Sequence, residues 1–384
     1  MADPLRGKTA IVGAAESDLG KVAVGLTSMD LMAQASLRAL SEAGLTKNDV
    51  DGVFSSSAYY QMASCELAEY MGIRPRYTDS TTIGGSSFVS HLHHAARAIN
   101  AGAIDVALIA YGSTQRSDSG RLVSSATLLP YEDVHKARHP VSMYALAASR
   151  HMHEYGTTRE QIAEVAVAAR GWAKDNPKAF MRDDLTIEDV VNARLISEPF
   201  TSRDCCVVTD GGGALVVTSA ERAKDLAKPP VHVLGIAEAH WHRHISQMPD
   251  LTTTAAVESA PRAYEMAGVK PADFDVVMIY DAFTISTIMF LEDLGLCAKG
   301  EGGAFVADGG IAPGGRLAVN TNGGGLSYCH PGMYSIFTMI ESVHQLRGES
   351  GARQVADAKL AVAHGSGGVL STQVTAVLGC AETV

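Results

Sequence analysis

The sequence predicts an α/β protein built from two similar halves, and three observations support this. Residues 39–53 (ALSEAGLTKNDVDGV) and 263–277 (AYEMAGVKPADFDVV) share one pattern, 224 residues apart. The mostly apolar runs 11–17 and 233–239 open the two halves in the same way. A helix followed by a strand recurs later in each half. Self-similarity of this kind indicates two copies of one structural unit.

Each copy of the pattern reads as a helix that ends at Ala-Gly, a short loop and a strand. Gly44 and Gly268 suit the left-handed conformation that follows many helices. Because the strands are apolar on both faces, we expect helices on both sides of the sheet. The later helix–strand units and the closing strands lie at 91–112, 333–365, 212–219 and 368–379.

These correspondences divide the chain into an N-terminal half (1–225) and a C-terminal half (226–384). A charged, Pro-ended segment at 220–230 joins them. The first half carries an insertion at about 115–200 that is rich in helix-forming residues. Insertions of this size usually carry function or an interface.

Composition narrows the class of protein. The 384 residues are 46% hydrophobic and carry a net charge of −11, which disfavours binding to nucleic acid. No apolar stretch of about 18 residues is present, so we expect a soluble, cytoplasmic protein without a membrane segment. The six cysteines include no CxxC pair, and a zinc ribbon within this chain is not expected.

The segment NTNGGGLSYCHPG is the first candidate for chemistry. Its three consecutive glycines allow another group to approach the backbone closely. His330 precedes a helix predicted to begin near Met333, and a helix N-terminus stabilises an anion. A histidine there can bind a developing oxyanion or transfer a proton. A glycine-rich turn with an incidental histidine is the alternative.

Three further segments place polar groups near predicted strand ends or helix starts. Tyr280 and Asp281 (IYDAFT) follow an apolar strand, where α/β proteins collect ligands. His364 (AHGSGG) precedes a glycine turn. Ser86 and Ser87 (IGGSSF) begin a helix, where either serves as a nucleophile or simply as a helix cap.

These segments resemble the thiolase superfamily along nearly the whole chain. NTNGGGLSYCHPG resembles the thiolase N-x-x-G-G-x-x-x-x-x-H-P loop, YDAFT resembles the N-E-A-F or H-D-C-F segment, and AHGSGG lies where thiolases carry a second cysteine. The resemblance is strongest to the sterol-carrier-protein-x branch, which includes thiolases and steroid side-chain aldolases. It implies a duplicated fold of two β-α-β-α-β-β halves in five α-β-α-β-α layers, with the insertion as a loop domain.

Two positions depart from the thiolase pattern. An ungapped alignment places the nucleophilic cysteine of thiolases at Gly85, one residue before Ser86. The second cysteine corresponds to His364. Glycine cannot hold an acyl group, and serine is a weak nucleophile without an adjacent base.

The resemblance therefore implies an enzyme that makes or breaks a carbon–carbon bond in an acyl-CoA thioester. Retro-aldol cleavage of a β-hydroxyacyl-CoA is our first hypothesis, because it needs a base and an oxyanion site but no cysteine. His330 would act at the thioester, and Tyr280 or His364 would take the β-hydroxyl proton. The alternatives are a thiolase-type acyltransferase using Ser86, Ser87 or direct attack by coenzyme A, and a non-catalytic acyl-CoA-binding scaffold. Expected substrate-binding residues are Gly85, Asp281, Asn322, Gly324, Gly325, Ser366 and Gly367.

The resemblance also bears on cofactors and partners. It implies no bound cofactor, coenzyme A as part of the substrate, a homodimer, and a separate small partner protein with a zinc ribbon and an OB fold. His240, His242 and His244 would share one side of an extended strand, but surface histidines are favoured there over a metal site. His91, His93 and His94 lie on the helix after Ser87, as a polar face or as lining of a pocket or interface.

Overall fold

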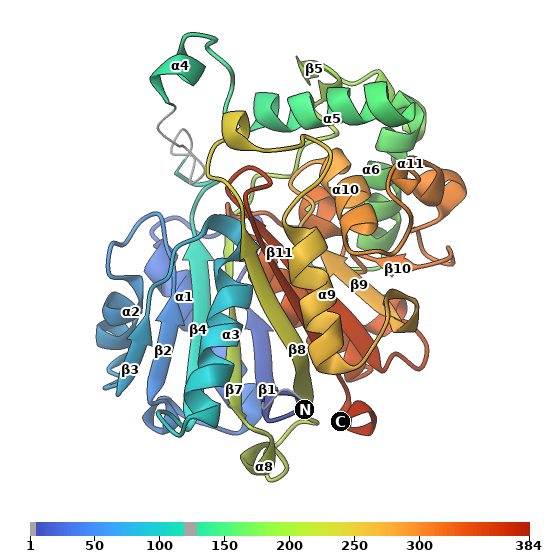
Figure 1. The fold of residues 1–384 in the computed structure, drawn as a ribbon. Coiled ribbons are helices and arrows are strands. Elements are labelled where there is room, and N and C mark those ends of the chain that lie inside the picture. Colours follow the sequence, from blue (N-terminus) through green and yellow to red (C-terminus); the bar gives the residue numbers. More distant parts are fainter. Residues whose placement is uncertain (1–4, 119–128) are drawn as a thin grey trace.

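Residues 5–118 and 129–384 are described here from a computed structural model, drawn in Figure 1. Ten residues of the predicted insertion, 119–128, lie outside the described part. The first half contains β1 (Thr9–Glu16), α1 (Ser28–Ala43), β2 (Gly52–Ser55), α2 (Ala63–Met71), β3 (Tyr77–Asp79), α3 (Ser87–Asn100), β4 (Val106–Ser113) and β7 (Gly211–Ser219).

The second half repeats the core of this order. After α8 (Ala220–Ala223) in the joining segment, it contains β8 (Val231–His240), α9 (Ala256–Ala267), β9 (Val276–Ile279), α10 (Thr284–Asp293), α11 (Gly302–Val306), β10 (Ala318–Val319), α12 (Ser335–Leu346), β11 (Leu360–Gly367) and β12 (Thr372–Gly379). The predicted repeat is confirmed: α1 and α9 end at left-handed Gly44 (φ 72°) and Gly268 (φ 71°), and each leads through a short 3₁₀ turn into β2 or β9.

Within the described residues, ten strands form one mixed sheet in the order β10-β9-β11-β12-β8-β1-β7-β4-β2-β3. The strands that open the two halves, β1 and β8, pair with each other antiparallel and join the halves. Their neighbours β7 and β12 also run antiparallel to them, while β2 and β4, like β9 and β11, pair in parallel.

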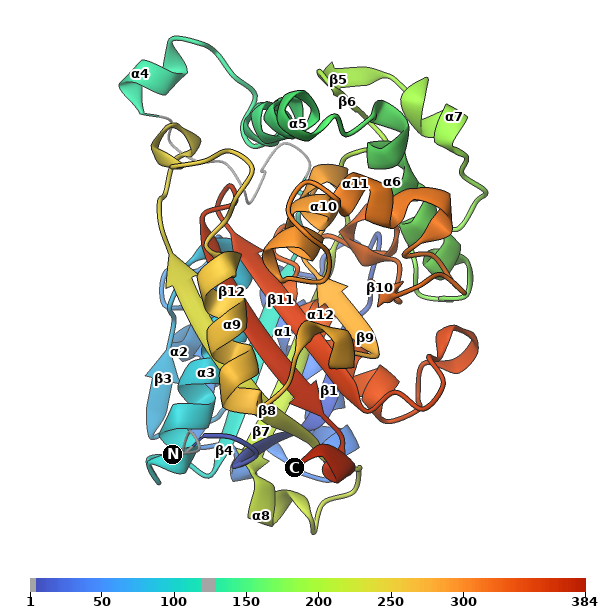
Figure 2. The same cartoon turned by 45° about the vertical axis from the view of Figure 1, so that its right-hand side comes forward.

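Helices cover both faces of this sheet, as the apolar strands predicted. On the outside, α1 packs on β1, β4 and β7, and α9 packs on β8 and β12. The buried helices α3 and α12 contact each other and strands of both halves. They form the central layer of the duplicated fold (Figures 1 and 2).

The insertion is mostly helical and lies across one end of the sheet (Figure 2). A buried hydrogen bond ties it to the second half: His151 Nε2 lies 3.0 Å from Glu292 Oε1, and Lys299 of the second half pairs with the other oxygen of Glu292 at 3.2 Å. Its described elements are α4 (Pro130–Asp133), α5 (Val141–Tyr155), α6 (Arg159–Lys174), α7 (Ile187–Val191), β5 (Leu195–Ser197) and β6 (Phe200–Thr201).

Two local predictions differ from the structure. The glycine-rich segment forms a π-helical turn, Gly324–Tyr328, and helix α12 begins at Ser335 instead of near Met333. His330 thus lies in the connection before the helix. Strand β8 ends at His240, so His242 and His244 are not on an extended strand with it.

Candidate active site

Tyr280 and His330 form the centre of the candidate site. Tyr280 follows strand β9, and its hydroxyl lies 3.0 Å from Nε2 of His330. The two rings meet edge to face at 5.5 Å between centroids. The amide of His330 donates to Thr209 Oγ1 at 3.0 Å, which fixes the backbone beneath the imidazole. The structure thus brings the strand-end tyrosine and the histidine of the glycine loop together.

Both side chains are buried and held in their neutral forms. Burial lowers the pKa of His330 to about 4, so the imidazole is uncharged near neutral pH. Burial, together with nearby acidic groups such as Cys206, raises the pKa of Tyr280 well above its usual value. A neutral tyrosine hydroxyl can relay a proton to the neutral imidazole, which then carries a positive charge opposite the negative charge on the substrate.

Gly85 lies against the ring of Tyr280. A Cβ atom at Gly85 would lie 2.7 Å from Tyr280 Cζ and 2.7 Å from the carbonyl oxygen of Ser366. No real side chain tolerates such contacts, so a side chain at position 85 and the tyrosine ring compete for one space. Gly85 is the middle residue of a 3₁₀ turn, Gly84–Ser86, that leads into α3, whose N-terminus therefore lies beside Tyr280.

Asp281 organises the glycine-rich loop. Its buried carboxylate accepts the amide protons of Gly325 (2.6 Å) and Leu326 (3.3 Å). Burial raises the pKa of Asp281 to about 7, and the backbone hydrogen bonds oppose this increase. A Cβ at Gly324 would lie 2.7 Å from the Asp281 Cγ, which explains the need for glycine there. The loop amides are therefore occupied by Asp281, which acts as a support for the loop.

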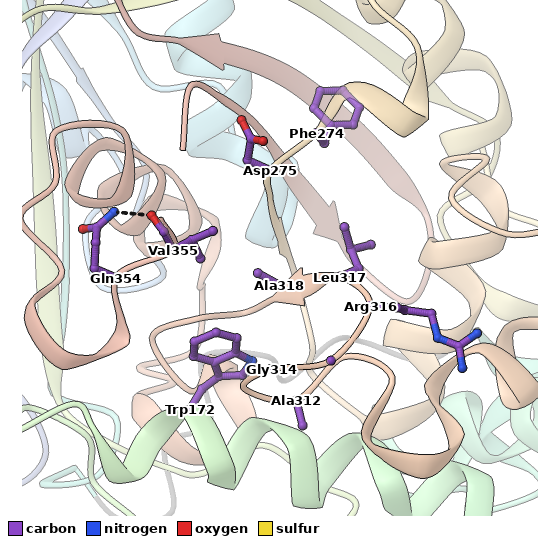
Figure 3. Close-up of a pocket in the computed structure, with 11 residues that line it drawn as sticks. Trp172, Phe274, Asp275, Ala312, Gly314, Arg316, Leu317, Ala318, Gln354 and Val355 are labelled. Carbon is purple, nitrogen blue, oxygen red and sulfur yellow. Dashed lines mark hydrogen bonds between the residues drawn. The ribbon is translucent and has the colours of Figure 1, made fainter. Parts of the chain in front are cut away.

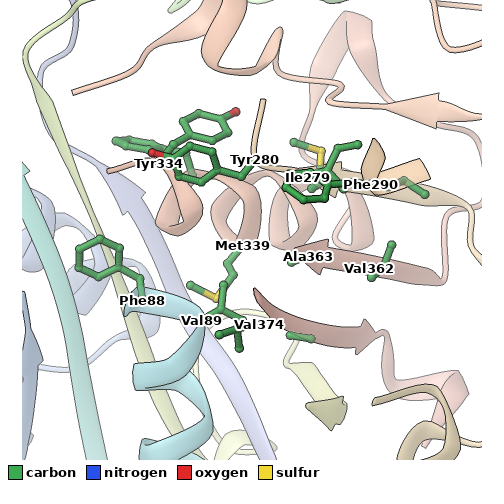
Figure 4. Close-up of a cluster of buried hydrophobic side chains, with 14 of the residues drawn as sticks. Phe88, Val89, Ile279, Tyr280, Phe290, Tyr334, Met339, Val362, Ala363 and Val374 are labelled. Atoms are coloured by element: carbon green, nitrogen blue, oxygen red, sulfur yellow. The ribbon is translucent and has the colours of Figure 1, made fainter. Parts of the chain in front are cut away.

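Asn322 continues this support toward the aromatic residues. Its Oδ1 accepts the amide proton of Gly324 (2.8 Å) and the hydroxyl proton of Tyr334 (3.0 Å). The Tyr334 ring lies 5.7 Å from that of Tyr280 and 6.1 Å from that of His330. Figure 4 shows Tyr280 and Tyr334 side by side, with Phe88 of α3 facing them.

Ser86 and Ser87 are engaged away from any base. Ser86 Oγ lies 2.6 Å from Thr372 Oγ1 and donates to the carbonyl of Ile83, while Ser87 Oγ donates to the carbonyl of Gly84. No histidine is among the hydrogen-bond partners of these two described residues. Gly367 approaches Ser86 closely, since a Cβ there would lie 2.7 Å from Ser86 Oγ. The arrangement matches helix-start serines rather than an activated nucleophile.

The structure does not bring His364 to Tyr280. Strand β11 continues to Gly367, so His364 lies inside the strand instead of at its end. Its ring nitrogens lie 2.9 Å from Thr375 Oγ1 and 2.9 Å from Gln373 Oε1, and its ring packs on Phe290 of α10. The neighbouring Gly365 faces α3 and α12, and alternation along a strand turns His364 to the outer face. Ser366 meanwhile accepts a 3.2 Å hydrogen bond from Gln373.

This placement predicts a structural effect for His364→Ala. The change would remove one hydrogen bond each from Gln373 and Thr375 and open a cavity, so the free energy of unfolding should fall by about 2–5 kcal/mol. Denaturant unfolding measures this loss. The kcat of the folded fraction should remain that of the wild type, and a large fall in kcat at unchanged stability would return His364 to the catalytic set.

Three tyrosines near the site were not predicted. Tyr111 lies inside strand β4, donates to the carbonyl of Pro331 and accepts from the Met333 amide at 3.1 Å, which holds the segment after His330. Tyr334 follows His330 by four residues. Tyr144 of α5, whose ring lies 4.5 Å from Phe283, has no local sequence feature that marks it.

The other histidine groups have separate partners. His93 and His94 pair with Glu238 (2.7 Å) and Asp79 (2.6 Å), and the Nε2 of buried His91 lies 3.0 Å from the Thr81 carbonyl. His240, His242 and His244 contact Glu238, the Val369 carbonyl and Glu132 respectively. Within residues 5–118 and 129–384, no group of three or more His, Cys, Asp or Glu side chains is arranged to hold a metal ion.

A cavity of about 420 Å³ lies at the other end of the sheet, near β10 (Figure 3). Its polar lining groups are already bonded: Trp172 Nε1 donates to the Ile311 carbonyl, and the carboxylate of Asp275 accepts the amides of Lys359 and Leu360. We therefore assign it no chemistry. No helix in the described ranges is long and apolar enough to cross a bilayer.

Comparison with known proteins identifies the family. The sequence is 36% identical over 372 residues to a 17-hydroxy-3-oxo-4-pregnene-20-carboxyl-CoA lyase of Mycobacterium tuberculosis, covering 90% of this chain and 93% of the relative. The chain belongs to the thiolase superfamily, in its sterol-carrier-protein-x branch. A family described as "Thiolase C-terminal domain-like" matches residues 237–380 of this thiolase-like protein.

Further relatives carry two kinds of name. A steroid side-chain-cleaving aldolase of Thermomonospora curvata is 34% identical (90% of this chain, 92% of the relative). An acetyl-CoA acetyltransferase of Methanothermobacter thermautotrophicus is 32% identical (94% and 97%). A solved "Ltp2-ChsH2(DUF35) aldolase" superposes with a TM-score of 0.89 at 31% identity over 98% of both chains. Human mitochondrial 3-ketoacyl-CoA thiolase shares the fold (TM-score 0.73, 17% identity, 99% of this chain and 100% of that chain).

These findings confirm the predicted family and the duplicated α/β fold. They also confirm the expected class of activity, an enzyme that makes or breaks a carbon–carbon bond in an acyl-CoA thioester.

Proposed function

We propose that this thiolase-like protein cleaves a β-hydroxyacyl-CoA by a retro-aldol reaction and uses no cysteine nucleophile. One observation carries the proposal: the ring of Tyr280 fills the space that a side chain at Gly85 would need, and its hydroxyl lies 3.0 Å from His330. The position of the thiolase nucleophile is thus occupied by a proton-transfer group. Two of the relatives at 34–36% identity are named as a lyase and an aldolase.

The proposed reaction begins with proton transfer. Tyr280 accepts the proton of the β-hydroxyl as its own proton passes to Nε2 of His330. The bond between the α- and β-carbons then breaks, which leaves a ketone or aldehyde and the enolate of the shortened thioester. Returning the proton from His330 through Tyr280 to the α-carbon gives the product acyl-CoA and restores both residues.

The enolate oxygen needs stabilisation while this occurs. Helix α3 begins at Ser87, two residues after Gly85, so we place its positive end beside the reacting atoms. We assign the enolate to this end because Asp281 already occupies two amides of the glycine-rich loop. Asp281, Asn322, Gly324 and Gly325 then support the loop, and Ser366 and Gly367 shape the wall beside Gly85.

The decisive experiment is to incubate the protein with β-hydroxyacyl-CoA thioesters in the absence of free coenzyme A. We expect a carbonyl product and a shortened acyl-CoA in equal amounts, since nothing in the proposed cycle consumes coenzyme A. A product that forms only from a β-ketoacyl-CoA with added coenzyme A would instead support the acyltransferase, which the acetyl-CoA acetyltransferase relatives favour. Binding of acyl-CoA without turnover of any thioester would support the non-catalytic scaffold instead.

We further propose two partners. Strand β3 forms one edge of the sheet, and pairing it with β3 of a second copy would give a homodimer in which this edge is covered in each copy. A small zinc-ribbon and OB-fold protein is proposed as a second partner, since the solved relative's name joins two components. Acyl-CoA is the substrate, with no other cofactor proposed. The assay above should be repeated with the complex isolated from the native host.

A further inference from the structure

A second cavity, of about 690 Å³, lies between helix α5 and the segment that follows strand β8. Its apolar lining comes from both sides: Met143 and Leu146 on α5, and Ile245, Met248 and Leu251 on the segment after β8. The volume is within the roughly 300–1,000 Å³ of ligand sites and exceeds what a short acyl chain fills. The cavity therefore suits a bulky apolar group.

The polar part of the lining excludes anions. Glu132 and Glu198 supply carboxylates, and serines such as Ser142 and Ser149 supply hydroxyls. A hydrogen bond from Ser246, at 2.5 Å, lowers the pKa of Glu132 and keeps it ionised. Two carboxylates repel the phosphates of coenzyme A, whereas the serines can bond the hydroxyl or keto oxygens of an otherwise apolar body.

The hairpin between β11 and β12 connects this cavity with Tyr280. At the site end, the carbonyl of Ser366 lies beside Gly85. Three residues further, in the turn that joins β11 and β12, the Val369 carbonyl lies 3.1 Å from His242 Nε2, and His242 belongs to the segment that lines the cavity.

Helix α5 touches the hairpin from its other side. The Tyr144 hydroxyl lies 3.4 Å from the Gly368 carbonyl. Tyr144 directly follows Met143, which lines the cavity. The hairpin tip is thus held by the same two segments that form the cavity (Figure 1). A substrate with its β-oxygen at Tyr280 can extend along this tip into the cavity.

We infer that this cavity binds the apolar body of the acyl group and selects bulky β-hydroxyacyl-CoA thioesters over short ones. The inference rests on the proposed function, which places the reacting β-carbon of the substrate at Tyr280. The body enters away from coenzyme A, whose phosphates the carboxylates keep out. Met143, Leu146 and Met248 are the residues that set the size limit.

The test fills the cavity without disturbing the fold. Leu146 is 52% exposed, so Leu146→Trp should fold normally while its ring enters the cavity. Leu195→Trp is the matched control, because Leu195 is 61% exposed in β5 and does not line the cavity. For each protein, kcat/KM is measured with a polycyclic and with a short-chain β-hydroxyacyl-CoA.

We expect Leu146→Trp to lower the ratio of kcat/KM for the polycyclic over the short substrate by about 10–200-fold. The control should keep the wild-type ratio. An unchanged ratio in Leu146→Trp, or an equal loss for both substrates, would overturn the inference.

A binding measurement separates this inference from the proposed function. Calorimetry with a saturated polycyclic acyl-CoA, which has no β-hydroxyl, reports the cavity without any cleavage. If the wild type cleaves no β-hydroxyacyl-CoA but Leu146→Trp still weakens this binding about 10-fold or more, the proposed function fails and the cavity assignment stands. If cleavage occurs and binding is unaffected, the cavity assignment alone fails.

Discussion

Tyr280→Phe should lower kcat by about 10²–10⁴-fold, the usual contribution of a positioned proton-transfer group. The change removes only the hydroxyl that lies 3.0 Å from His330, and the ring still fills the space beside Gly85. Binding of acyl-CoA and thermal stability should therefore change little. Steady-state kinetics with a β-hydroxyacyl-CoA, together with calorimetric binding, would measure both effects.

The matched control is Tyr264→Phe. Tyr264 is a buried tyrosine whose hydroxyl donates to the Leu294 carbonyl at 3.1 Å, remote from the site on α9. The Tyr264→Phe variant should lose about 1 kcal/mol of unfolding free energy and keep the wild-type kcat. Activity in Tyr280→Phe close to that of the wild type would remove Tyr280 from the mechanism and favour direct action of His330.

The pH dependence of kcat in the wild type gives a second measure of the same pair. His330 must be neutral to accept the proton, and burial lowers its pKa to about 4. Activity should therefore persist as pH falls through 6.5, where a free histidine becomes charged, and decline only near pH 4. An acid limb at about 6.5 would indicate that the group being titrated is not the buried imidazole.

Gly85→Cys, which introduces the residue that thiolases carry, should inactivate this enzyme. The Cβ alone would lie 2.7 Å from Cζ of Tyr280 and from the Ser366 carbonyl oxygen. Overpacking of this kind costs about 1–3 kcal/mol, and displacing the tyrosine by about 1 Å costs about 10²-fold in rate. Thermal unfolding and retro-aldol kinetics would show both losses together.

Combining Gly85→Cys with Tyr280→Ala tests the steric explanation. Removing the ring frees the space, so the double variant should regain the melting temperature lost in Gly85→Cys and remain without retro-aldol activity. Its thiol would lie near His330, and mass spectrometry after incubation with an acyl-CoA should detect an acyl-enzyme. Ala101→Cys, at the exposed far end of α3, controls for the added thiol. Wild-type stability and activity in Gly85→Cys alone would contradict the account.

Much of the fold was predictable because it depends on local patterns. The repeat that ends in Gly44 and Gly268 specifies a helix, a left-handed cap and a strand in each half, since each step needs only neighbouring residues. The boundary at Ser335 was less predictable. His330-Pro331-Gly332 has the composition of a helix start, but the chain bends there, with Gly332 at φ 98°, and helix α12 begins only at Ser335. Tyr111 holds this segment through the Pro331 carbonyl and the Met333 amide.

The sequence by itself predicted the duplicated fold and the family, and it singled out Tyr280 and His330 as candidates, because the repeat unit, the glycine loop and the strand end are each patterns of neighbouring residues. Only the tertiary structure decided what the glycine at position 85 means. Residues 85, 280 and 366 are far apart in the chain, and their competition for one volume exists only after the two halves pack around α3. The same packing separates His364 from the site, since the strand that carries Ser366 turns alternate side chains to opposite faces of the sheet.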